Sequence, residues 1–265
     1  MNSLTKLVFL SLSCKKVVHY FCISFACTLL YFTSYAQVKL KKENVKTNQL
    51  KPAILYWEFG SPEFVTIETI YPSKDSVATY WNVTHRSPTL NDAENNGFDY
   101  YMIKEKTLQP VISHMYHLGF TNYQISVKKD SAWFTIKSMH DTVSYALPVP
   151  EFIIPDGPGL PVFIGSLPLT KGYSIEYPEL SRWSGKAPYI GEVVTTKLEV
   201  VGTDNLEIEG KRYATYKLTI SSDQGRFTEL WVLKNKPHYP VKINHKIDSN
   251  RMMKSSVVKL ILFTT

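Results

Sequence analysis

The segment Leu147–Tyr173 limits the possible folds more than any other part of this 265-residue chain. Six of its residues are prolines, and a proline lacks the backbone N–H that a sheet ladder needs, so the segment cannot be an interior strand. Apolar side chains nevertheless dominate it. We therefore expect a crossover that fills the main core, with one short helical turn at Val162–Leu167. The alternative interpretation is a lid or wall of a pocket for an apolar ligand.

Short strand patterns separated by turn residues lie on both sides of this segment. Phe64–Tyr71 is rich in β-branched residues, and Tyr213–Ser221 alternates cleanly. Glu176–Pro188 has the composition of a loop, and Gly202–Asn205 that of a turn. No part of the chain shows a long helical period, so the pattern predicts an antiparallel sheet.

A single sheet of about ten strands must curl or split into two. We therefore predict a mainly β fold. Its curved antiparallel sheet forms an unclosed β-barrel, with the apolar, proline-rich segment or a short helix across the concave face. A β-sandwich is the alternative architecture.

The N-terminal residues Met1–Ala36 have the pattern of a secretory signal peptide. A basic beginning is followed by the apolar run Val17–Phe32 and by Ser34–Ala36, a small-x-small cleavage site. This pattern predicts an exported protein, periplasmic or secreted, with no transmembrane segment in the mature chain. A retained N-terminal anchor and lipidation at Cys27 are the alternatives.

After cleavage, residues 37–51 are expected to form a flexible leader and residues 52–265 a single β-rich domain. All three cysteines lie within Met1–Ala36, so the fold must be stable without disulfides. Subtracting the three lysines of that segment from the net charge of +7 leaves +4. So mild a charge, with no run of basic residues and interleaved aromatics, argues against a nucleic-acid partner.

No sequence motif for catalysis or for binding a cofactor or metal is present. His114 and His117 form an HxxH pair, which would suit a metal on a helix. On the strand predicted here the two would point to opposite faces. We therefore expect no cofactor, no metal and no catalytic residue.

Aromatic and apolar side chains are the remaining candidates for a binding site. A half-barrel could hold an apolar ligand between its strands and the central segment. The residues expected to line it are Phe152, Ile154, Leu160 and Phe163 of the central segment and Trp133, Tyr216 and Trp231 of the strands.

The order of these parts resembles that of a set of uncharacterised periplasmic bacterial proteins with an unclosed β-barrel, similar to periplasmic lipoprotein carriers. The residues that carry the resemblance are Thr107–Pro110, Leu167–Tyr173 and the C-terminal run Val200–Lys242, with Glu209–Tyr213 and Glu229–Val232 inside it. The resemblance covers Thr107–Asp248. It implies a curved antiparallel sheet around a helix or apolar plug, binding of a lipid-like ligand, and no catalytic residue.

The sequence thus predicts a non-enzymatic exported protein that binds a lipid-like or other apolar small molecule in a half-barrel. The alternative is a module of the cell envelope that binds another protein. A hydrolase ranks last, because no catalytic motif supports it.

Overall fold

The computed structural model describes residues 38–39, 45–59, 61–87, 97–117, 121–138, 140–155, 157–181, 191–246 and 252–263. The chain forms two compact units, Met1–Val38 and Lys39–Thr265. The predicted signal peptide and Cys27 lie outside the described residues. The fold described below belongs to the second unit.

The strands form two antiparallel meanders, one on each side of the central segment. The first comprises β2 (Ala53–Phe59), β3 (Ser61–Lys74), β4 (Thr79–Ser87), β5 (Gly97–Lys104), β6 (Pro110–His117), β7 (Thr121–Lys128), β8 (Ser131–Ser138) and β9 (Thr142–Pro148). The second comprises β11 (Ser174–Ser181), β12 (Glu192–Ile208), β13 (Lys211–Ser222), β14 (Phe227–Leu233), β15 (Pro240–Lys246) and β16 (Met252–Leu262). The short elements are β1 (Val38–Lys39), η2 (Thr47–Gln49), β10 (Ile154–Pro155), η4 (Gly157–Gly159) and α2 (Leu160–Ser166).

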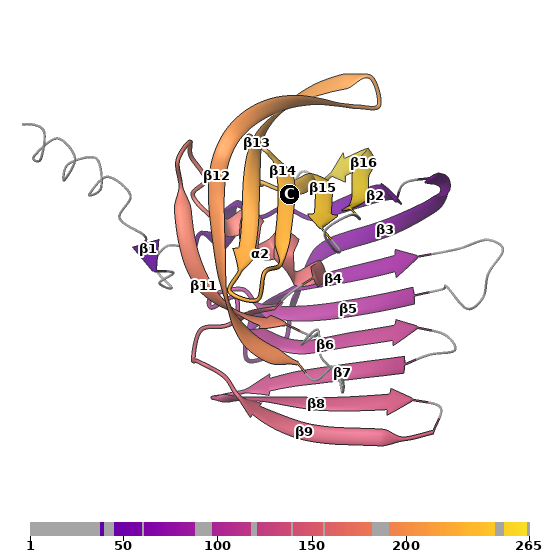
Figure 1. Ribbon diagram of the computed structural model, residues 1–265, viewed down its shortest axis with the longest axis vertical. Coiled ribbons are helices and arrows are strands. Elements are labelled where there is room, and N and C mark those ends of the chain that lie inside the picture. The colour runs from indigo at the N-terminus through magenta and orange to yellow at the C-terminus, as the bar shows by residue number, and fades with distance from the viewer. Residues whose placement is uncertain are drawn as a thin grey trace, which may run out of the picture. The chain divides into compact units, whose positions relative to one another are not determined.

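Pairing of β16 with β2 joins the two meanders into one sheet, with Leu260 opposite Leu55. Fourteen strands follow one another from β11 through β16, then from β2 to β9. Within the described residues β11 and β9 are the two ends of this antiparallel run and do not pair with each other, so the sheet is curved but not closed (Figure 1). The predicted unclosed antiparallel barrel is confirmed, and one continuous sheet rules out the β-sandwich.

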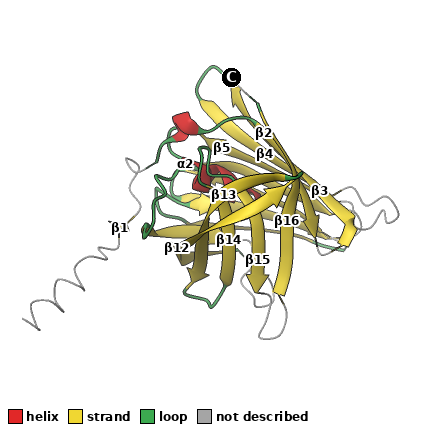
Figure 2. Ribbon diagram, turned by 90° about the horizontal axis from the view of Figure 1, so that it is seen from above, coloured by secondary structure: helices red, strands yellow, loops and turns green. Residues whose placement is uncertain are grey.

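The central segment connects the two ends of the sheet by crossing its concave face. Seen from above, α2 lies inside the curve of the strands (Figure 2). Its residues from Pro161 to Ser166 are all buried, and the Phe163 ring packs edge-on against Tyr177 of β11, with 4.6 Å between the ring centroids. The predicted helical turn at Val162–Leu167 is thus confirmed, beginning two residues earlier than expected.

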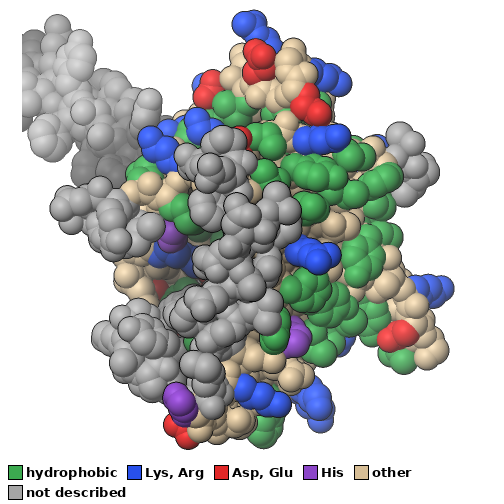
Figure 3. Space-filling view, turned by 90° about the vertical axis from the view of Figure 1, so that its right-hand side faces the viewer, with side chains coloured by type: hydrophobic (Ala, Val, Ile, Leu, Met, Phe, Trp, Pro, Cys, Tyr) green, Lys and Arg blue, Asp and Glu red, His purple; other side chains and the backbone are tan. Residues whose placement is uncertain are grey.

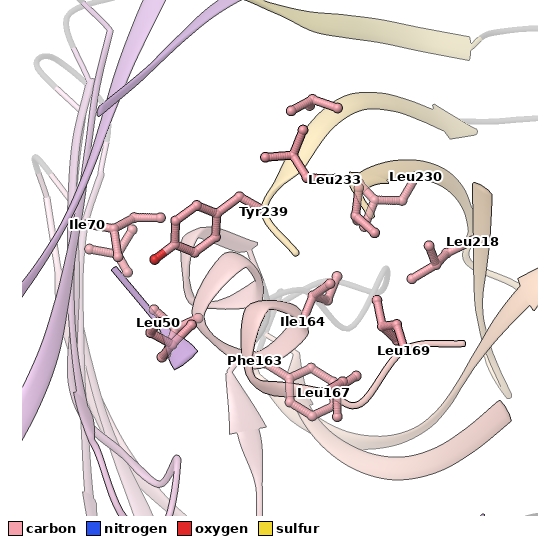
Figure 4. Packing of buried hydrophobic residues seen from close by; sticks show 14 of the residues in the cluster. Leu50, Ile70, Phe163, Ile164, Leu167, Leu169, Leu218, Leu230, Leu233 and Tyr239 are labelled. Atoms are coloured by element: carbon pink, nitrogen blue, oxygen red, sulfur yellow. The ribbon is translucent and has the colours of Figure 1, made fainter. Parts of the chain in front are cut away.

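The helix packs closely because Gly165 has no side chain. A Cβ at this position would lie 2.7 Å from Leu50 Cδ2 and 3.1 Å from Tyr239 Cε1. Figure 4 shows the ring of Tyr239 beside the helix, with Leu50 and Ile70 next to it. Leu218 and Leu230 of the second meander belong to the same core cluster as the helix. The interior at this end of the half-barrel is therefore filled by the protein's own side chains.

Order begins earlier than the sequence predicted. The Lys46 N–H donates to Ser166 O at 2.9 Å, and Leu50 is buried in the core. Residues 45–51 therefore pack against the helix, although their sequence has no strand period. Backbone carbonyls of α2 and an apolar contact with it hold residues 45–51 in place. The polar composition of residues 45–51 does not indicate these contacts.

Two segments predicted as loop and turn are strands. Glu176–Pro188 was expected to be a loop, but residues up to Ser181 belong to β11, with Ile175 and Tyr177 facing the core. Pro178 is tolerated because β11 ends the antiparallel run and, on its other side, pairs with β10 at Glu179 and Leu180 and not at Pro178. Gly202–Asn205 is not a turn but part of the long strand β12, which continues past a register shift between Val200 and Gly202.

The outer face of the sheet carries exposed apolar side chains, including Trp133 of β8 and Val201 of β12, and Val77 is exposed in the turn between β3 and β4. Figure 3 shows one face on which apolar side chains gather beside lysines and arginines. None of the helices in the described ranges has the length and apolar character that spanning a bilayer requires.

Candidate functional site

A cavity of about 590 Å³ lies within the curve of the sheet, at the N-terminal side of α2. Gly157, Leu160 and Pro161 form its wall on the central segment. The strands contribute apolar and polar groups side by side: Trp57, Phe59, Glu68, His85, Asp99, Glu179, Ser181, Ile220, Arg226, Thr228, Pro240, Ile243, His245, Met253 and Ser255. The apolar plug therefore fills one part of the half-barrel and leaves a second, partly polar part hollow.

One wall of the cavity carries three titratable side chains in a row across neighbouring strands, the Glu68–His85–Asp99 row. Glu68 of β3 lies directly opposite His85 of β4, and His85 lies opposite Asp99 of β5. Directly opposed residues of antiparallel strands have side chains close enough to interact. His85 Nδ1 lies 3.8 Å from Asp99 Oδ2. The register of three strands therefore places an imidazole between two carboxyl groups.

Glu68 is the most deeply buried of the three, with 5% of its surface exposed. Its Oε2 accepts a hydrogen bond of 2.9 Å from Trp57 Nε1. Burial raises the pKa of the Glu68 carboxyl above its ordinary value, while the nearby His85 and the Trp57 hydrogen bond lower it by less. The carboxyl group thus lies where its ionised form is poorly solvated.

The facing wall contains an ion pair at the other end of the sheet. Arg226 Nη2 donates to Glu179 Oε2 at 2.5 Å, and Glu179 is almost fully buried. Beside this pair, Thr228 Oγ1 and His245 Nδ1 share a hydrogen bond of 2.8 Å. Burial, and then the charge of Arg226, lower the pKa of His245 below its ordinary value. Both histidines of the cavity are therefore placed next to specific polar partners.

Ser255 of β16 lies between the two walls, opposite Phe59 of β2. Only 3% of its surface is exposed, and within the described part of the chain its Oγ has no hydrogen-bond partner. A buried hydroxyl without a partner carries a free-energy cost. A polar group held in the cavity would remove that cost.

Of the seven residues predicted from the sequence to bind a ligand, the structure places Leu160 in the cavity wall. Phe163 and Ile154 are fully buried in the core, and Phe152 packs against it. The three strand aromatics do not line the cavity. Whether any of the seven binds a ligand stays a prediction.

The strand aromatics have other contacts. Trp133 of β8 is 54% exposed on the outer face. Tyr216 meets the ring of His238 edge-on, with centroids 6.0 Å apart. Trp231 donates from Nε1 to Asp204 Oδ2 at 3.1 Å, and Lys242 Nζ lies 4.6 Å from its ring centroid.

The charged residues of the cavity were not predicted from the sequence, because only the register of the strands brings them together. Glu68 stands inside the β-branched run Phe64–Tyr71, and a lone charge in such a run was the available signal. Glu179 and Ser181 fell in a segment interpreted as a loop.

His114, which belonged to the HxxH pair, instead hydrogen-bonds through Nε2 to Asn122 Oδ1 at 2.6 Å. Within the ranges that the structure describes, no group of three or more His, Cys, Asp or Glu side chains is arranged to hold a metal ion.

The raised pKa of Glu68 predicts a pH-dependent stability. Between its ordinary pKa and the raised folded pKa, the folded protein keeps a proton that the unfolded chain loses, so stability falls as pH rises through that window. Glu68→Gln removes this titration. The free energy of unfolding of Glu68→Gln minus that of wild type is therefore expected to increase as the pH is raised from 4 to 8.

Urea denaturation across this pH range measures the effect. Glu58→Gln is the matched control, because Glu58 lies on the outer face of the neighbouring strand β2. A Glu68→Gln variant whose stability runs parallel to that of wild type would contradict the assignment.

Comparisons with known proteins identify a similar solved structure and a family, and neither comes with an activity. A crystal structure titled as a beta-barrel-like protein of domain of unknown function DUF1849 from Brucella abortus is 10% identical, with a TM-score of 0.46. The similarity covers 83% of this chain and 100% of that one. No curated protein matches the chain.

A protein-family model matches a range of the chain that includes strands of both meanders. Residues 94–255 match the family described as "Protein of unknown function (DUF3108)". The matched range contains Asp99 and the Glu179–Arg226 wall, whereas Trp57, Glu68 and His85 precede it. Because the match spans more than half of the sequence, the chain belongs to the DUF3108 family.

Proposed function

We propose that this protein binds a small amphiphilic molecule in the cavity of its half-barrel, without chemically changing it. The observation that carries the proposal is the cavity of about 590 Å³ whose wall combines apolar and titratable side chains. Ligand pockets for small molecules have volumes of about 300–1,000 Å³ and combine apolar walls with a few placed polar groups. An amphiphile would use both kinds of wall.

The apolar body of the ligand is assigned to the surface formed by Leu160, Ile220 and Ile243. Burial of apolar surface stabilises such a complex by about 25 cal/mol per Å² removed from water. The polar group is assigned to the side of Glu68 and His85. This proposal refines the lipid-like ligand expected from the resemblance to periplasmic lipoprotein carriers, because a purely apolar molecule would leave the charged wall desolvated.

We further propose that the protein acts after export, in the periplasm or outside the cell. The signal-peptide pattern of Met1–Ala36 supports this location. A carrier in an aqueous compartment would shield an apolar molecule from water.

Native mass spectrometry of the protein as purified from cells tests the binding proposal. We expect an adduct of small-molecule mass that disappears after denaturing organic extraction. Ser255→Trp, which fills the cavity, should lose the adduct. Ser256→Trp, on the opposite face of β16, should keep it. A wild-type protein without an adduct, and without lipid in the extract, would contradict the proposal. That result would favour the alternative, a module of the cell envelope that binds another protein.

A second candidate is a hydrolase acting on the bound molecule. The observation that favours it is the Glu68–His85–Asp99 row, in which a carboxyl group of raised pKa faces a cavity. Incubating the extracted ligand with fresh protein decides between the two. A new product that Glu68→Gln does not form would support catalysis, whereas a ligand recovered unchanged would support binding alone.

A further inference from the structure

The charge balance of the cavity wall is acidic. The described lining residues carry three carboxyl groups, from Glu68, Asp99 and Glu179, against the guanidinium group of Arg226 and the imidazoles of His85 and His245. The Glu68–His85–Asp99 row therefore has two carboxyl groups for one imidazole. The guanidinium of Arg226 lies 2.5 Å from Glu179, and the two charges offset each other. The wall formed by the Glu68–His85–Asp99 row therefore favours a positive group in the cavity.

Burial disfavours the ionised form of Glu68 unless a positive group lies next to it. The carboxyl group accepts one hydrogen bond from Trp57, and its raised pKa reflects the cost of ionising it away from water. A cation held beside a desolvated carboxylate compensates that cost, and the attraction is larger in a cavity than in bulk water. An anion at the same place would add like-charge repulsion.

Two aromatic residues of β2 stand beside the row. Trp57 and Phe59 both line the cavity, and the Phe59 ring centroid lies 6.4 Å from that of His85. The indole N–H of Trp57 is donated to Glu68, and the residue lines the cavity beside it. Aromatic faces attract ammonium groups electrostatically, most strongly where water is excluded.

Ser255 is an independent sign that the cavity suits a polar group. Its hydroxyl oxygen lines the cavity, is buried, and has no hydrogen-bond partner in the described ranges. A primary ammonium carries three N–H donors. An ammonium group in the cavity therefore has donors both for a carboxylate of the row and for the Ser255 hydroxyl.

We infer that the ligand is a cationic amphiphile, whose ammonium group lies against the Glu68–His85–Asp99 row and whose apolar body lies along Leu160, Ile220 and Ile243. This inference rests on the proposed binding function and narrows it to one class of head group.

Three probes with the same ten-carbon chain separate the head group from the apolar body: decylamine, which is protonated at neutral pH, 1-decanol and decanoate. Isothermal titration calorimetry below the micelle concentrations measures each affinity for the full-length protein at low salt. We expect decylamine to bind at least about tenfold more tightly than 1-decanol, a difference of about 1.4 kcal/mol. Decanoate should bind most weakly.

Variants then assign the preference to the row. Glu68→Gln and, separately, Asp99→Asn should reduce the preference for decylamine over 1-decanol and leave the affinity for 1-decanol nearly unchanged. Glu58→Gln, on the outer face, should keep the preference. If 1-decanol or decanoate binds the wild-type protein as tightly as decylamine, the cationic head group is wrong while binding in the cavity stands. If none of the three binds, the proposed binding function itself is contradicted.

Discussion

Replacing Phe163 with alanine is expected to lower the free energy of unfolding by about 3–5 kcal/mol. The ring is 1% exposed and lies on α2 at the centre of the core, edge-on to Tyr177. Its removal leaves a void where the plug contacts the strands, because the surrounding core relaxes only partly around the lost ring.

Equilibrium urea denaturation measures this change, with Phe98→Ala as the control. Phe98 is 40% exposed on β5, so its replacement is expected to change stability by about 0.5 kcal/mol or less. Equal effects of the two substitutions would contradict a central segment that acts as the plug of the half-barrel.

Replacing Arg226 with methionine is expected to lower the free energy of unfolding by about 3 kcal/mol. The substitution leaves Glu179, whose side chain is 3% exposed, without the guanidinium that faces it at 2.5 Å. A buried carboxylate deprived of its cation is far more costly than an absent ion pair.

The double variant Glu179→Gln/Arg226→Met provides the test, because it removes both charges. It should recover at least half of the stability lost in Arg226→Met. A double variant that is less stable than Arg226→Met would mean that the two side chains stabilise the fold through separate contacts, and not as a pair.

The curved, unclosed sheet was predictable because its strands alternate in sequence and its crossover cannot be a strand. Proline placement at Leu147–Tyr173 excluded an interior strand, and apolar content required burial, which together indicate a plug such as α2. Sequence patterns did not predict two parts of strands, one that contains a glycine at a bulge and one that contains a proline. β12 continues through Gly202 because a bulge absorbs the irregularity, and β11 accepts Pro178 because it ends the antiparallel run.

The cavity was harder to predict, because alternation identifies two faces of a strand without saying which is inside. Trp133 was assigned inward, yet it shares its face with Thr135 and Lys137, while the smaller Ala132 points to the core. The polar neighbours of Trp133 were the better guide to its orientation.

Register between strands decided the polar part of the site. Glu68, His85 and Asp99 lie far apart in sequence and become neighbours because each pair is directly opposed across a ladder. A shift of one residue in either pairing would turn one of them to the outer face. Single-sequence patterns do not determine that register.

The measurement that tests the central claim most directly is the response of the tryptophan indole N–H signals in an NMR titration with the tightest-binding decyl probe. Trp57 lines the cavity and donates to Glu68, whereas Trp133 and Trp231 lie outside it. Binding within the half-barrel predicts a saturable shift of the Trp57 signal, with the signals of Trp133 and Trp231 nearly unchanged. A shift confined to Trp133, with Trp57 unaffected, would place the ligand on the outer face and contradict the account.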